Sequence, residues 1–151
     1  MIGTQTRTPI HMLTMLLVAW CLMALCVVIH AGGVTYIVRW LAHQPEGAST
    51  FQHGMWLFVR IAGWIIVLHL LEIALWAVLY VYAGAMPDIQ TSFYFSVVTY
   101  TTTGYGDLVL PTEWRVVGGI EALTGILMCG LSTAFFFAVV SNVYQSRAAR
   151  R

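Results

Sequence analysis

The sequence predicts an all-α membrane protein with three membrane-spanning helices, a re-entrant half-helix and an extended segment that follows it. The chain is 60% hydrophobic and only 9% charged, whereas soluble domains are about a quarter charged. Three apolar runs are long enough to cross a bilayer, which takes roughly 20 helical residues. A fourth run, Ile89–Thr101, is apolar and aromatic but too short to cross. The net charge of +1 gives no basic footprint for nucleic acid.

The first span is expected over Met12–Ala31, with His30 near its end. Because glycine is a poor helix former, Gly32–Gly33 is expected to end or kink it. Val34–Leu41 then forms a short interfacial piece, and a polar loop with Pro45 and Gly47 follows. The alternative for this first run is a cleaved signal peptide.

The remaining two spans enclose the half-helix and form one unit with it. Asp88 is well placed to cap the half-helix at its N-terminus. A short half-helix between two spans is typical of a segment that enters and leaves the bilayer on the same side. The predicted boundaries are 1–54 for the N-terminal helix and loop and 55–143 for the second unit. The second unit divides into an outer helix (55–83), the half-helix (88–101), an extended segment (102–107) and an inner helix (116–143). A short basic tail, 144–151, follows, and we expect no cytoplasmic sensor domain in it.

Arginine placement predicts the orientation, since basic residues favour the cytoplasmic side. If the loop between the first two spans is cytoplasmic, five arginines lie inside: Arg39, Arg60, Arg147, Arg150 and Arg151. Only Arg7 and Arg115 lie outside. The expected location is therefore the cell's inner (plasma) membrane, with a cytoplasmic C-terminus and a half-helix that enters from outside. The C-terminal arginines are orientation anchors or contacts to anionic lipid.

The string Thr102–Thr103–Gly104–Tyr105–Gly106–Asp107 carries the functional prediction. Irregular backbone at membrane depth is tolerated where it is buried in protein or lines a water-filled path. Backbone carbonyls can replace the water that an ion sheds there. Aiming successive carbonyls at one axis requires alternating right- and left-handed torsions, which Gly104 and Gly106 permit. The Thr102 hydroxyl adds a further ring of oxygens, and Asp107 draws cations to the outer mouth.

Tyr105 lies between the two glycines, so its side chain must point away from the axis. We expect it to pack against Phe93, Tyr94 and Phe95 of the half-helix. The C-terminal end of that half-helix carries a partial negative charge, which favours a cation below the extended segment.

This string resembles the signature of potassium channels, Thr-Val-Gly-Tyr-Gly-Asp in most members. The match is Thr102, Gly104, Tyr105, Gly106 and Asp107, with Thr103 where valine is usual. The resemblance covers roughly Met55 to Val143. It implies a homotetrameric pore in which K⁺ binds at Thr102, Thr103, Gly104 and Tyr105, with no cofactor besides the permeant ion.

Two features depart from the family pattern. Many relatives place a carboxylate in the pore helix behind the filter, where this chain has Val98, so inactivation behaviour is in doubt. An additional N-terminal span precedes the pore unit, and the motif does not assign its role.

Four residues are candidates for gating. Gly125 of the inner helix is either a hinge or a site of close helix packing. Glu72 and Glu121 are carboxylates within spans, where charge is costly. His69 shares a helix face with Glu72. Each carboxylate either forms a proton-sensitive contact or forms a structural hydrogen bond between helices. Glu121 has a third alternative, which is to reach water. Structural roles are favoured for both.

Three rival functions remain open at this stage. A non-selective monovalent cation channel keeps the pore, although the intact Gly104–Tyr105–Gly106 triplet argues against it. A non-conducting partner subunit of another channel is the second rival. The third is a membrane enzyme with a metal bound at His69 and Glu72. It is disfavoured because the other histidines, His30 among them, are expected near span ends or in the loop.

Overall fold

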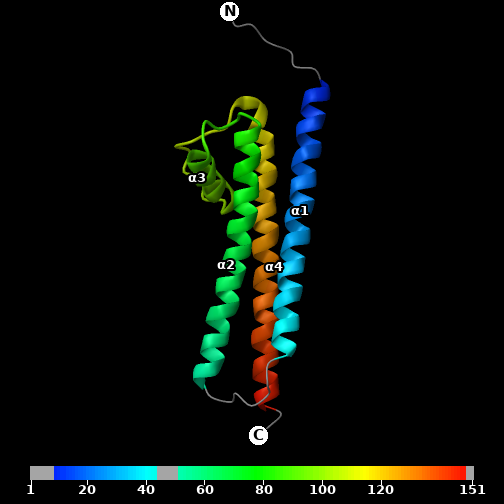
Figure 1. Cartoon of the computed structure of the whole chain (residues 1–151), viewed down its shortest axis with the longest axis vertical. Coiled ribbons are helices and arrows are strands. Elements are labelled where there is room, and N and C mark those ends of the chain that lie inside the picture. Colours follow the sequence, from blue (N-terminus) through cyan, green and yellow to red (C-terminus); the bar gives the residue numbers. More distant parts are fainter. Residues whose placement is uncertain (1–8, 44–50, 149–151) are drawn as a thin grey trace, which may run out of the picture. The chain divides into compact units, whose positions relative to one another are not determined.

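The computed structural model of the chain describes residues 9–43 and 51–148, and the predicted fold class is confirmed for them. They form four α-helices and one short 3₁₀-helix (Figure 1): α1 Pro9–Ala42, α2 Phe51–Tyr82, α3 Ile89–Tyr100, η1 Thr112–Trp114 and α4 Arg115–Ala148. Three helical segments are long and apolar enough to cross a membrane: Met12–Ala42, Met55–Tyr82 and Thr112–Ser141. α3, with 12 residues, is the predicted half-helix.

The first span differs from its prediction, because α1 continues through the glycine pair to Ala42. Gly32–Gly33 neither ends the helix nor separates Val34–Leu41 from it. At Gly33 the reason is close packing, since an added Cβ would come 2.5 Å from Cδ2 of Leu68 on α2. His30 therefore lies within a helix rather than near its end.

The chain divides into two compact units, and the three long helices contribute to both. The first contains residues 73–126 together with the chain up to Cys26. In it, the Ser92 hydroxyl of α3 donates to the Ala77 carbonyl of α2 at 2.7 Å. The ring of Phe95 meets that of Tyr80 edge-on at 5.5 Å. These contacts fix α3 beside the C-terminal part of α2 (Figure 1).

The second unit contains residues 27–72 and the chain from Leu127 onward. Its core is a buried cluster of Ile37, Ile61 and Ile65, supported by half-buried side chains that include Phe135 and Phe136. Arg60 lies within a span, with its guanidinium carbon 4.5 Å from the centre of the Trp40 ring. Stacking on an aromatic face is a favourable environment for such a charge.

Helix bounds agree closely with the sequence prediction around α3. They agree less well at the start of α2, which begins at Phe51 rather than at 55, and at the C-terminal end of α4. α3 begins at Ile89 with Asp88 as its N-cap, and α2 ends at Tyr82. α4 runs to Ala148, past the predicted end at 143, so part of the predicted tail is helical. Several residues of the orientation and loop predictions lie outside the described residues: Arg7, Pro45, Gly47, Arg150 and Arg151.

Candidate functional site

The backbone of the segment after α3 alternates in handedness. Thr102, Gly104 and Gly106 have φ values of +59°, +54° and +79°, whereas Thr103 and Tyr105 stay at negative φ. The two glycines were predicted at these positions because they adopt left-handed torsions without a Cβ penalty. Thr102 was not predicted there, since a left-handed β-branched residue is uncommon and costs roughly 1–2 kcal/mol. No sequence signal besides the every-second-residue spacing marks it.

Hydrogen bonds to α3 fix this segment. The Val98 carbonyl accepts from the backbone N–H of Thr103 at 2.9 Å and of Gly104 at 3.2 Å. The Thr99 carbonyl accepts from the N–H of Thr102 at 2.9 Å. Three consecutive N–H groups are thus bound to the last turn of α3. Many relatives carry a carboxylate at the position of Val98. In this chain the backbone carbonyl oxygen of Val98 holds the segment instead, through the N–H groups of Thr103 and Gly104.

The Thr103 hydroxyl, which most family members lack, has a partner within the segment. It lies 2.9 Å from the Thr101 hydroxyl, which in turn donates to the Val97 carbonyl at 2.7 Å. The polar group that Thr103 adds is therefore hydrogen-bonded, and its presence is compatible with the fold of the segment.

The whole segment is exposed on the single chain. All residues of 101–107 are exposed, and the Tyr105 side chain is 72% exposed. We expected this ring to pack against Phe93, Tyr94 and Phe95, but these residues of its own chain do not cover it. Phe95 instead packs against Tyr80 of α2.

Two carboxylates bond to α3, one at its N-terminus and one near its middle. The Asp88 carboxylate accepts from the Thr91 N–H at 2.9 Å and from the Thr91 hydroxyl at 2.8 Å. These bonds hold the pKa of Asp88 below its ordinary value. Near the middle of α3 the Tyr94 hydroxyl donates to the Asp107 carboxylate at 2.7 Å. This bond raises the pKa of Tyr94, and the sequence reasoning missed the pair.

Glu121 is fully buried and joins two helices. The Tyr80 hydroxyl of α2 donates to its Oε2 at 2.8 Å. The geometry supports the structural hydrogen bond among the roles considered for Glu121, and 0% exposure contradicts the idea that it reaches water. Its Oε1 is also buried, and the Ser96 hydroxyl interacts with this carboxylate.

Gly125 lies against the C-terminal end of α3. A Cβ at this position would overlap the Tyr100 carbonyl oxygen. Of the two roles considered, hinge and close packing, the geometry supports close packing.

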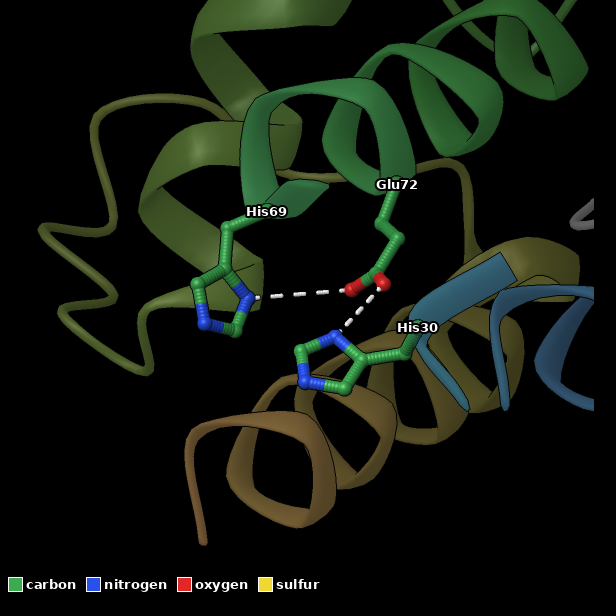
Figure 2. A group of neighbouring side chains, drawn as sticks. All are labelled: His30, His69 and Glu72. Carbon is green, nitrogen blue, oxygen red and sulfur yellow. Dashed lines mark hydrogen bonds and ion pairs between the residues drawn. The ribbon is translucent and has the colours of Figure 1, made fainter. Parts of the chain in front are cut away.

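A second histidine, His30, lies beside Glu72 and His69. It was not predicted there from the sequence. His30 of α1 lies beside the Glu72 carboxylate, with its Nδ1 at 2.9 Å from Oε1, and Figure 2 shows all three side chains pointing toward one another. The prediction that His30 lies near a span end and away from this pair is wrong, because α1 does not stop at the glycines.

The fold and this geometry define a class of membrane protein. In it, a half-helix lies between two spans and is followed by an irregular segment with left-handed torsions at every second residue. The family model described as "Ion channel" matches residues 54–142. The chain belongs to this ion channel family, and it is a channel protein rather than an enzyme.

Curated relatives that match are potassium channel proteins. "Potassium voltage-gated channel protein Shal" of Drosophila melanogaster is 36% identical over 58 residues, which is 38% of this chain and 10% of the relative. "Potassium voltage-gated channel protein shk-1" of Caenorhabditis elegans is 43% identical over 59 residues, which is 38% of this chain and 11% of the relative. The human "Voltage-gated potassium channel regulatory subunit KCNG1" is 31% identical over 125 residues, 78% of this chain and 24% of the relative.

This chain thus spans from about a tenth to a quarter of the length of these relatives. Comparison with solved structures found no significant match. The family and the multi-pass membrane character are established on these grounds.

Proposed function

We propose that the chain is a subunit of a homotetrameric, potassium-selective channel that conducts K⁺ passively through a filter formed by residues 102–106. The observation that carries this proposal is the left-handed torsion at every second residue, Thr102, Gly104 and Gly106, within a Thr-Thr-Gly-Tyr-Gly string. Such alternation turns successive carbonyls to one side of the strand. The names of the curated relatives agree with potassium as the ion.

In this mechanism the carbonyl oxygens of the segment replace the water that K⁺ sheds, so that dehydration costs little. Three N–H groups are occupied by α3 carbonyls, which leaves the segment's own carbonyls available to the ion. The Thr102 hydroxyl supplies oxygens at the inner end. Asp107 adds negative charge at the mouth, which concentrates cations there.

A closed ring of carbonyls needs more than one chain. One chain supplies one strand, and this strand is exposed along its whole length, 101–107. Four copies around one axis would cover it and would give Tyr105, 72% exposed on the single chain, a neighbour to pack against. The homotetramer is therefore part of the proposal.

We further propose that this pore lies in the plasma membrane with a cytoplasmic C-terminus. Arg39 and Arg60 belong to the same unit, and Arg60 stacks on Trp40. This pairing supports the assignment of both arginines to one membrane face, which the excess of basic residues makes the inner one.

Purified protein in liposomes with a K⁺ gradient tests the proposal. We expect K⁺-driven flux that is absent when Na⁺ is the only cation. Gly104→Ala should abolish it, because alanine at φ +54° is strained by about 1–2 kcal/mol and four copies compound the effect. Gly63→Ala is the matched control, since Gly63 is helical and an added Cβ there meets nothing within 4 Å. Equal K⁺ and Na⁺ flux would instead identify a non-selective channel.

A second candidate is a non-conducting subunit that assembles with another channel. The observation in its favour is that a relative named as a regulatory subunit matches 78% of this chain. The same liposomes discriminate the two functions. Purified protein that is tetrameric yet carries no K⁺ flux would favour the regulatory role.

A further inference from the structure

The buried group around Glu72 joins three helices within one compact unit. Glu72 and His69 lie on α2, His30 on α1 and Ser132 on α4. Glu72 and His30 have 0% and 1% of their side-chain surface exposed, and His69 has 17%. Buried ionisable groups at membrane depth are costly and by default indicate function.

The two imidazoles share the same two neighbours. Nδ1 of His30 is 2.9 Å from Glu72 Oε1, and Nδ1 of His69 is 3.7 Å from Glu72 Oε2. On the opposite edge, Nε2 of His30 and of His69 lie 3.0 Å and 3.1 Å from the Ser132 hydroxyl oxygen. Both rings therefore turn Nδ1 toward the carboxylate and Nε2 toward the hydroxyl (Figure 2 shows the carboxylate side).

For two neutral histidines, counting protons gives one consistent set of tautomers. The Ser132 hydroxyl has one proton and contacts two Nε2 atoms, so one histidine must donate to it from Nε2–H. A neutral His30 needs its proton on Nδ1 to donate to the carboxylate at 2.9 Å. His69 is then the donor to Ser132, and the Nδ1 lone pair of neutral His69 faces Glu72 Oε2. A separation of 3.7 Å, beyond hydrogen-bond distance, agrees with two electron-pair donors facing each other.

Two imidazole nitrogens and a carboxylate oxygen thus converge on one point. All three ligand atoms lie within 4.8 Å of one another. Zn²⁺ binds His nitrogen and carboxylate oxygen at about 2.0–2.2 Å, so its tetrahedral ligands stand roughly 3.3–3.5 Å apart. The nearest contacts are 2.9 Å from His30 Nδ1 to Glu72 Oε1 and 3.7 Å from His69 Nδ1 to Glu72 Oε2, so they lie on either side of this value but end on different oxygens. A carboxylate that binds the ion through one oxygen must therefore turn slightly.

Ser132 suits the role of an outer partner to such a metal. With Nδ1 of both histidines on the ion, each ring carries its proton on Nε2, and the hydroxyl oxygen has two lone pairs to accept both. Metal-bound histidines commonly donate their second N–H to a fixed acceptor in this way. The change requires that the His30 proton move from Nδ1 to Nε2 and that the Ser132 hydroxyl turn its own proton, which it donates to His30 Nε2 in the metal-free state, away from both rings.

We propose that His30, His69 and Glu72 form a binding site for a divalent transition metal of the Zn²⁺ class, with Ser132 as the outer partner of both histidines. The site fastens α1, which lies outside the family match at 54–142, to α2. It thereby gives the additional N-terminal helix a metal-dependent attachment to the channel unit. The proposal does not depend on ion conduction.

The test is metal binding by the purified full-length protein in lipid nanodiscs after treatment with a chelator. We expect one Zn²⁺ per chain by elemental mass spectrometry. We also expect visible absorption from Co²⁺ at the same stoichiometry, and a thermal midpoint that rises with Zn²⁺ concentration. Ser132→Ala should weaken binding by about 10- to 100-fold, as loss of an outer partner does elsewhere.

Three single variants separate the site from adventitious binding. His30→Gln and Glu72→Gln should each abolish stoichiometric binding, with folding checked by helical circular dichroism and elution volume. His43→Gln is the matched control, because His43 directly follows α1, is exposed, and its ring is hydrogen-bonded to the Arg39 carbonyl rather than to Glu72 or Ser132. Folded wild-type protein without stoichiometric metal would overturn the proposal. Binding that survives both His30→Gln and Glu72→Gln would overturn it as well.

Discussion

Gly125 is the residue whose role changes most once the structure is known. From the sequence it is equally a hinge and a packing glycine, because both roles require the absence of a side chain. An added Cβ would overlap the Tyr100 carbonyl oxygen, which supports the packing role. The inner helix can then approach the end of α3 closely, which places the segment that begins at Thr102.

Gly125→Ala should destabilise the protein by about 1–3 kcal/mol, the usual cost of overpacking, because the added methyl overlaps a backbone oxygen. The measurement is the thermal or denaturant unfolding of the purified protein in detergent. Gly130→Ala is the control on the same helix, since an added Cβ there meets nothing within 4 Å. A Gly125→Ala protein as stable as Gly130→Ala, but with altered gating, would contradict the packing role and restore the hinge.

Among the elements, α3 is the one on which the candidate site depends. Its first turn is held by Asp88, its last turn supplies the carbonyls that bind Thr102, Thr103 and Gly104, and its Tyr94 holds Asp107. A short helix has little intrinsic stability. These end contacts and the packing on Tyr80 therefore maintain it.

The Asp88 cap should give the protein an acid-dependent stability. Hydrogen bonds from Thr91 lower the pKa of Asp88 in the folded state, below about 3.9 in the unfolded chain. The stabilisation is fully present above the unfolded pKa and is lost as the pH falls through the folded pKa. We expect wild-type protein to lose thermal stability below about pH 4 more steeply than Asp88→Asn, which keeps an acceptor oxygen but does not titrate.

The measurement is the thermal midpoint from circular dichroism between pH 3 and pH 7, taken as the difference between the two proteins. Asp88→Ala, which lacks the acceptor, should be less stable than both at neutral pH. Parallel pH profiles for wild type and Asp88→Asn would show that this carboxylate does not contribute.

The elements of the pore segment could be predicted because each has a local signal. Length and hydropathy mark the spans, Asp88 marks the start of α3, and Gly104 and Gly106 mark the left-handed positions. The continuity of α1 could not be predicted, since glycine's low helix propensity was the only local signal at Gly33. Its contact with Leu68 is tertiary.

The same reason explains what was missed in the candidate sites. His30 and Glu72 are 42 positions apart, and the Tyr94–Asp107 and Tyr80–Glu121 pairs also join separate segments. No periodicity within one helix reveals such pairs. The family resemblance did not supply them either, because its motif, Thr102 to Asp107, contains at most one member of each pair. The torsion of Thr102 could not be predicted for another reason. Threonine disfavours left-handed φ values, yet Thr102 has one.

At the scale of the whole molecule, the exposed segment 101–107 is the feature that a single chain leaves unexplained. A backbone held in strained torsions persists when its surroundings over-determine it. Here α3 supplies one side of those surroundings. We propose that three further copies of the chain cover the remaining, exposed side of the segment, around a shared axis along which K⁺ passes.

Imaging the purified particle in lipid at high K⁺ by electron cryomicroscopy tests this claim most directly. The account predicts a four-fold axis lined by the backbone oxygens of Thr102, Thr103, Gly104 and Tyr105, with ion density between successive rings. A particle without four-fold symmetry, or one in which these oxygens face away from the axis, would contradict it.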